Sequence, residues 1–301
     1  MQKLAFIVVG TCLIAGCQTA PGPRPATPAA VTLTFSCTVS AAVAKASYVG
    51  AYAGVENVIS PADAARDVYC ADAFKAGKYP RGFVTIFGSS RIEKDNKACD
   101  ATGKCDEVLR QNDRMYAAVR EFASSWTRRH GRTLPILTGA GPGLMAAASE
   151  GASAAGGASI GYTTYYDRAE PPAPADSVRP YVGDPAKAFN EFVSDGLIFT
   201  SVAQREAAMI RHSAAIVIAP GGTGTEWEIY QVIETIKSRQ QSPVPVYFLG
   251  DRETYWAGLD ARLRDLVGRK VVRQSELDPF LRFVATPAEL VERLGKELVL
   301  P

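Results

Sequence analysis

Short apolar segments alternate with longer segments of helical pattern from residue 82 to the end of the chain. The apolar segments have the length and the β-branched and aromatic content of buried strands. These predicted strands span residues 83–87, 134–137, 159–162, 197–200, 215–219 and 244–249. The segments between and after them fit helices, and the longest has a clear apolar stripe. These predicted helices span residues 106–129, 144–155, 202–212, 226–238, 255–266 and 287–298.

Strand–helix alternation of this kind indicates an α/β fold in which helices cover both faces of a parallel sheet. We therefore expect a Rossmann-like, doubly wound domain over residues 81–301. Residues 39–80 are rich in alanine and show helical patterning, with Pro61 at a favourable helix start and Gly77 near the helix end. This part is predicted to be a helical N-terminal extension packed onto the main domain.

The first residues indicate export. Lys3 precedes an apolar run that is too short for a permanent membrane-spanning helix, as in a signal peptide. The run ends in Leu-Ile-Ala-Gly-Cys, which resembles a bacterial lipobox; the alternative is an ordinary signal peptide with an incidental cysteine at Cys17. We expect residues 1–16 to be removed, Cys17 to be lipidated, and the Pro- and Ala-rich residues 17–38 to act as a linker. Because Gln18 rather than Asp follows the cysteine, the expected location is the outer membrane, facing the periplasm.

The remaining cysteines are consistent with an oxidising compartment. Apart from Cys12 in the signal peptide and the lipidated cysteine, the chain contains Cys37, Cys70, Cys99 and Cys105. An even number predicts two disulfides. The short glycine-containing loop between Cys99 and Cys105 favours that pair, which leaves Cys37 with Cys70. A zinc site is the alternative, but the chain has no C-x-x-C pair and only two histidines, so we expect no metal site.

The charge balance argues against a polymeric nucleic acid as partner. The chain carries 33 basic and 31 acidic residues, which gives a net charge of +2. Binding to a phosphate backbone depends on a surplus of positive charge. The expected partners are therefore a small molecule and, through the lipid anchor, a membrane.

Two glycine-containing loops follow predicted strands, at the sheet edge where open parallel sheets bind ligands. One is the loop 88–91 and the other is 139–143; the second departs from G-x-G-x-x-G because Leu144 stands where the third glycine would be. A plain tight turn is the alternative for each loop. The candidate nucleotide-binding residues are Gly88, Ser89, Ser90, Gly139, Gly141 and Gly143.

A third loop is the strongest candidate site. It follows the predicted strand 215–219 and leads into a helix. Its glycines let successive amides converge on an oxyanion, its threonines add hydroxyls, and a helix N-terminus favours negative charge. The candidate phosphate-binding residues are Gly221, Gly222, Thr223, Gly224 and Thr225. No Gly-Lys-Ser/Thr follows, so a monophosphate fits better than a triphosphate with magnesium.

Two charged residues near this loop have alternative interpretations. Glu228 lies three residues after Thr225, a spacing that also fits a capping box. Arg205, near the start of the preceding helix, could equally be a surface arginine.

The nonapeptide PGGTGTEWE at 220–228 resembles the P-G-G-x-G-T-x-x-E signature of the Lonely Guy family. The resemblance extends to the segments 86–91, 137–161 and 204–222 and covers roughly residues 82–298. Members of this family are phosphoribohydrolases that release the base from cytokinin or purine nucleoside 5′-monophosphates, and relatives long carried the label lysine decarboxylase. Pyridoxal-phosphate decarboxylation is not expected here, because no lysine stands beside the loops to form a Schiff base.

The resemblance implies a role for each motif. The third loop would bind the 5′-phosphate, and the first two would line the ribose and phosphate side of the pocket. Arg205 and Glu228 would be the catalytic residues. Glu206 stands where the family has a lysine paired with the arginine, which is a reversal of charge and puts the substrate in question.

The expected function is hydrolysis of the N-glycosidic bond of a nucleoside 5′-monophosphate, purine, pyrimidine or cytokinin-type, to a free base and ribose 5-phosphate. No cofactor is needed for this chemistry, and the family resemblance implies a homo-oligomer. Two alternatives stay open: a nucleotide-binding lipoprotein or carrier without turnover, and a structural envelope lipoprotein that reuses the fold.

Overall fold

The computed structural model describes residues 34–39, 44–51, 59–165, 188–279 and 281–300. Met1–Thr34 and Phe35–Pro301 form separate units, and every helix and strand below belongs to the second. The predicted signal peptide, Cys17 and most of the linker lie outside the described residues. Within the described part, no helix combines the length and the apolar character that a bilayer crossing requires.

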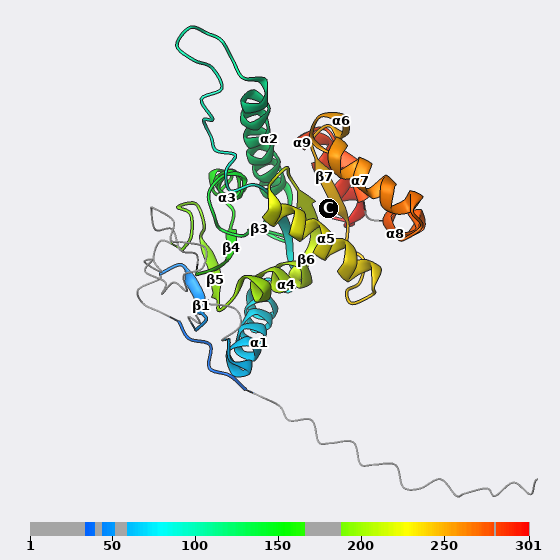
Figure 1. Ribbon diagram of the computed structural model, residues 1–301. Helices are drawn as coiled ribbons and strands as arrows, with labels where there is room; N and C mark the ends of the chain where they lie inside the picture. Colours follow the sequence, from blue (N-terminus) through cyan, green and yellow to red (C-terminus); the bar gives the residue numbers. More distant parts are fainter. Residues whose placement is uncertain (1–33, 40–43, 52–58, 166–187, 280, 301) are drawn as a thin grey trace, which may run out of the picture. The chain divides into compact units, whose positions relative to one another are not determined.

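Eight parallel strands form one sheet in the order β1-β5-β4-β3-β2-β6-β7-β8 (Figure 1). The strands are β1 Ala46–Val49, β2 Phe83–Phe87, β3 Ile136–Thr138, β4 Ser159–Thr164, β5 Asp195–Phe199, β6 Ser213–Ile218, β7 Val246–Leu249 and β8 Leu281–Val284. From β2 the chain adds β3, β4 and β5 on one side and β6, β7 and β8 on the other. The predicted doubly wound α/β fold is therefore confirmed, with its topological switch point between β2 and β6.

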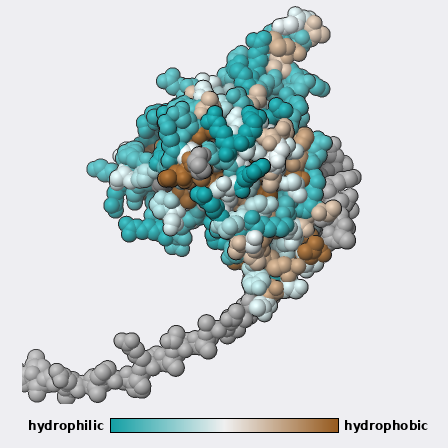
Figure 2. All heavy atoms as spheres, turned by 180° about the vertical axis from the view of Figure 1, so that it is seen from behind, coloured by the Kyte–Doolittle hydropathy of each residue, from teal (hydrophilic) through white to brown (hydrophobic). Residues whose placement is uncertain are grey.

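Helices cover both faces of the sheet (Figure 1). The helices are α1 Pro61–Lys78, α2 Glu107–His130, α3 Leu144–Ala154, α4 Val202–His212, α5 Thr223–Lys237, α6 Arg252–Tyr255, α7 Ala257–Gly268, α8 Gln274–Leu277 and α9 Pro287–Glu297. One apolar core holds side chains of α1, α4, α5, α7 and α8, and the other holds those of α2, α3 and α9. Seen from the opposite side, the surface is largely hydrophilic (Figure 2), as expected when helices turn their apolar stripes inward.

Helix α2 illustrates how the sequence pattern produces this packing. The Asp106 carboxylate caps its N-terminus by accepting hydrogen bonds from the amides of Val108 and Leu109. Its apolar stripe is buried from Tyr116 onward, and Phe122 and Trp126 are completely inaccessible to solvent. Burial of such a side chain contributes about 1.5–3 kcal/mol, so the stripe fixes α2 on the sheet.

The N-terminal extension differs from its prediction in one respect. Its helix α1 is present, but Ala46–Val49 forms a strand that pairs with β5 at the sheet edge rather than a helix. Both predicted disulfides are present: Cys37–Cys70 ties the segment before β1 to α1, and Cys99–Cys105 closes the short loop before α2. The pattern also missed β8 at the opposite edge.

Candidate functional site

The three glycine loops meet at the carboxyl ends of β3, β2 and β6, which are neighbours in the sheet. The amide of Ser89 in the first loop donates a hydrogen bond to the Pro220 carbonyl of the third, at 3.2 Å. The amide of Leu144, which follows the second loop, donates to the Ser89 carbonyl at 2.8 Å. The structure therefore brings together loops that lie more than 50 residues apart in the sequence, at the switch point of the sheet.

Two glycines are required by this contact. Gly143 has a φ of 67°, and a Cβ atom there would lie 2.4 Å from the Ser89 carbonyl oxygen. A Cβ atom on Gly221 would lie 2.0 Å from Oγ1 of Thr225. The first glycine lets two loops approach each other, and the second lets the third loop fold over the start of α5.

Helix α5 begins with amides that no side chain caps. Its N-cap is Gly222, without a side-chain hydrogen bond, and its first helical bond runs from the amide of Glu226 to the Gly222 carbonyl at 2.9 Å. The amides of Thr223, Gly224 and Thr225 therefore precede the helical ladder. A Cβ atom on Gly222 or Gly224 would meet nothing within 4 Å, so this helix end is open to a ligand. The arrangement is that of an anion-binding helix N-terminus.

The capping-box interpretation of Glu228 is wrong. Because α5 begins at Thr223 rather than after Thr225, Glu228 lies six residues beyond the N-cap and cannot reach back to it. Its side chain is buried, and Oε1 lies 3.7 Å from Nη2 of Arg205.

Arg205 is a buried residue of α4, not a surface arginine. Gly139 makes room for it, since a Cβ atom there would lie 2.6 Å from Nη1 of the guanidinium. The second glycine loop and α5 thus lie on either side of this arginine: the loop packs against its guanidinium, and α5 supplies the facing carboxylate.

Glu206 also directs its carboxylate to the Arg205 guanidinium, and it is 1% exposed. One arginine therefore serves two buried carboxylates. Oε2 of Glu206 has no hydrogen-bond partner among the described residues. Burial raises the pKa of Glu228 to about 7, and Arg205 offsets only part of that rise. A carboxyl group that titrates near neutrality is suited to proton transfer.

The other predicted residues line the same region. A Cβ atom on Gly88 would contact Leu144 and Ala219, and one on Gly141 would lie 2.6 Å from Cε of Met145. The Ser89 hydroxyl accepts a hydrogen bond from the amide of Arg91 at 3.0 Å, so it shapes its own loop, and Ser90 is exposed.

Sequence reasoning missed Asn190. Its backbone amide donates a hydrogen bond to the Ala140 carbonyl at 2.9 Å, and its side-chain Nδ2 donates to the Gly141 carbonyl at 3.1 Å. Asn190 thereby holds the second loop, in which Ala140 adopts a positive φ of 61°. A single asparagine outside any motif carries no signal of this role. In the described residues no three His, Cys, Asp or Glu side chains converge as metal ligands would.

The fold and the converging loops define a Rossmann-like α/β protein with an uncapped helix N-terminus at its switch point. Residues 145–294 match the family model described as "Possible lysine decarboxylase", which is the Lonely Guy family. This match supports a Lonely Guy-type Rossmann-like protein. No curated protein matches it.

Solved structures with a similar fold have low identity to this chain. A structural-genomics target shares 15% identity at a TM-score of 0.44, over 71% of this chain and 99% of that one. The molybdenum cofactor carrier protein of Chlamydomonas reinhardtii shares 15% sequence identity at a TM-score of 0.44, and the match covers 72% of this chain and 98% of that one. The molybdenum cofactor binding protein of Rippkaea orientalis shares 16% sequence identity at a TM-score of 0.44, and the match covers 72% of this chain and 97% of that one. At this level of similarity, none of them informs on the ligand of this chain.

Proposed function

We propose that this protein hydrolyses the N-glycosidic bond of a nucleoside 5′-monophosphate and releases a free base and ribose 5-phosphate. The observation that carries the proposal is the buried contact between Arg205 of α4 and Glu228 of α5, because α5 also has an uncapped N-terminus that suits an anion. Glu228 lies six residues from the N-cap, which is about 9 Å along the helix axis. A phosphate at the helix end would thus bring its sugar close to the carboxylate.

The residue chemistry supports this reaction. Cleavage of a ribosyl bond passes through a state with positive charge on the sugar. Ionised Glu228 would stabilise that charge and accept a proton from the attacking water. With a pKa of about 7, a substantial fraction of Glu228 is ionised at neutral pH. Arg205 would hold the carboxylate and the ribose hydroxyls in place, and binding of the phosphate would position the sugar.

The direct test is a panel of AMP, GMP, CMP and UMP incubated with the purified protein, with the products separated by chromatography. We expect free base and ribose 5-phosphate from at least one of them. The Glu228→Gln variant should still bind that nucleotide, because the anion-binding amides are unchanged, but should not cleave it. If none of the four is cleaved, hydrolysis of these substrates is excluded.

A second candidate function is nucleotide binding without turnover. The observation that favours it is Glu206, whose carboxylate engages Arg205 where the family has a lysine. Without that lysine, one positive charge near the reacting sugar is lost. If no nucleotide is cleaved and one of them still raises the melting temperature, a binding protein or carrier is the better account.

The cellular setting is proposed from the sequence. A lipid on Cys17 would hold the domain at the outer membrane, in the periplasm, through the 17–38 linker. The Cys17→Ser variant should then leave the membrane fraction for the soluble fraction. The homo-oligomer implied by the family is tested by light scattering of the protein without its lipid.

A further inference from the structure

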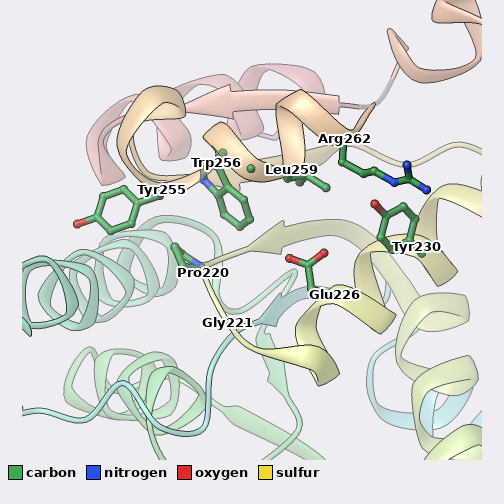
Figure 3. Close-up of a pocket in the computed structure, with 9 residues that line it drawn as sticks. Pro220, Gly221, Glu226, Tyr230, Tyr255, Trp256, Leu259 and Arg262 are labelled. Atoms are coloured by element: carbon green, nitrogen blue, oxygen red, sulfur yellow. The ribbon is translucent and has the colours of Figure 1, made fainter. Parts of the chain in front are cut away.

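A cavity of 260 Å³ lies on the other side of the third loop (Figure 3). The loop contributes Pro220 and Gly221, α5 contributes Glu226 and Tyr230, and the segment that forms α6 and α7 contributes most of the opposite wall. The cavity thus lies between α5 and the C-terminal part of the domain, beside the end of β6, and opens to solvent.

This cavity is separate from the Arg205–Glu228 pair. Each helical residue turns the side chain by about 100°, so Glu226 and Glu228 point about 200° apart around α5. Glu226 and Tyr230, four residues apart, lie on one face. Burial agrees with this geometry, because Glu228 is buried whereas Glu226 and Tyr230 are exposed. Helix α5 therefore stands between the two sites.

Apolar side chains form the floor of the cavity, and an aromatic ring lies at its rim. Figure 3 shows the Trp256 indole extending from the start of α7 toward Pro220, with Leu259 beside it. Nε1 of Trp256 donates a hydrogen bond to the Leu249 carbonyl at 3.1 Å, and the indole is only 3% exposed, so it forms an apolar floor. Tyr230 at the rim is exposed and is the ring that a ligand can reach. Aromatic rings bind other flat rings by offset stacking or edge contacts.

The charged side chains at this cavity determine which polar groups a bound ring should carry at its edge. The Glu226 carboxylate is directed toward α7, and Arg262 extends from α7 toward Tyr230 (Figure 3). A carboxylate only accepts hydrogen bonds and a guanidinium only donates them. Nη1 of Arg262 also lies 2.9 Å from Oδ2 of Asp265, so the positive charge of the guanidinium is partly balanced. One acid and one base favour an uncharged ligand whose edge carries both N–H donors and acceptor atoms.

We propose that this cavity is a second binding site, for a neutral nitrogen heterocycle of the size of a free nucleobase. Its volume is just below the roughly 300–1,000 Å³ typical of pockets for drug-sized ligands, which suits one small ring system. The site goes beyond the proposed function, because it uses neither the Arg205–Glu228 pair nor bond cleavage. Since Pro220 and Gly221 belong both to its wall and to the anion-binding loop, its occupant would also alter nucleotide affinity.

The test is calorimetric titration of the purified protein with adenine, hypoxanthine, cytosine and uracil. We expect saturable one-to-one binding of at least one base. Glu226→Gln replaces an acceptor oxygen with a donor and should weaken that binding tenfold or more. Glu253→Gln, an exposed carboxylate on α6 outside the cavity, should not change it. A second variant, Leu259→Trp, fills the cavity and should abolish binding in a protein whose circular dichroism spectrum is unchanged.

The proposal is overturned if no base binds, or if Glu226→Gln and Leu259→Trp both bind as the unchanged protein does. A third titration separates it from the proposed function: AMP is added to base-saturated Glu228→Gln, which is designed not to cleave it. Binding of AMP in the presence of the base supports two sites, whether or not the unchanged protein is a hydrolase. Mutual exclusion means that the cavity is part of the nucleotide site, and overturns the separate site.

Discussion

Two glutamates of α5, only two residues apart, lie in opposite environments. Glu228 is buried against Arg205, whereas Glu226 is exposed at the rim of a cavity. Burial raises the pKa of Glu228 to about 7. The comparison teaches that the position of a carboxylate on a helix, rather than its residue type, determines whether it can exchange protons at neutral pH.

The largest effect is expected when Glu228→Gln removes the ionisable group. If Glu228 is the catalytic base, the rate of base release should fall by about 10²–10⁴-fold, because general base catalysis contributes that much. Nucleotide affinity should change by less than about threefold, which calorimetry can measure. The matched control is Glu234→Gln, an exposed carboxylate on the same helix paired with Lys237, which should retain the full rate. An equal loss of rate and affinity would instead assign Glu228 a structural role.

The next largest effect concerns the partner of Glu228. Arg205→Gln leaves the buried carboxylates of Glu206 and Glu228 without their shared positive charge. Removing one member of a buried ion pair costs about 3–5 kcal/mol of stability, so the variant should unfold at clearly lower urea concentration. Arg293→Gln breaks an exposed pair with Glu289 and should cost at most about 1 kcal/mol. Similar midpoints for the two variants would contradict the buried pairing.

The pH dependence of stability should report on the ionisation of Glu228. The folded-state pKa of Glu228 is raised from 4.5 to about 7, so the folded protein binds its proton more tightly than the unfolded chain does. The stability from this group is therefore fully present below pH 4.5 and is lost as the pH rises through 7. The whole change is about 3 kcal/mol.

The measurement is the free energy of unfolding in urea between pH 4.5 and 8, compared with that of Glu228→Gln. The difference between the two proteins should shift steadily in favour of the variant as the pH rises. A pH-independent difference would mean that Glu228 titrates at its ordinary pKa and is more hydrated than the structure indicates.

The sequence predicted most of the fold because its elements are locally encoded. The strand at Phe83–Phe87 is a continuous apolar run, and α4 runs between Val202 and His212 as its pattern indicates. The edge strands were missed for a physical reason. Ala46–Val49 becomes a strand through pairing with β5, which lies about 150 residues away, and no local pattern reports such a contact.

The site was predicted in part. The motif located the amides of 221–225, since glycine content and the helix start are local properties. That Gly139 makes room for Arg205, and that Glu206 shares this arginine with Glu228, depends on packing between distant segments. The cavity beside Trp256 had no sequence signal, because its walls come from α5 and α7, and no motif joins them.

The smallest expected effect is on the stability of Glu226→Gln. Because Glu226 is exposed, its substitution should change the free energy of unfolding by no more than about 0.5 kcal/mol. The variant thus separates ligand binding from folding: a loss of base affinity without a loss of stability is the signature of a side chain that faces a ligand. A destabilisation comparable to that of Arg205→Gln would place Glu226 in the folded framework, and the contrast between the two sides of α5 would no longer hold.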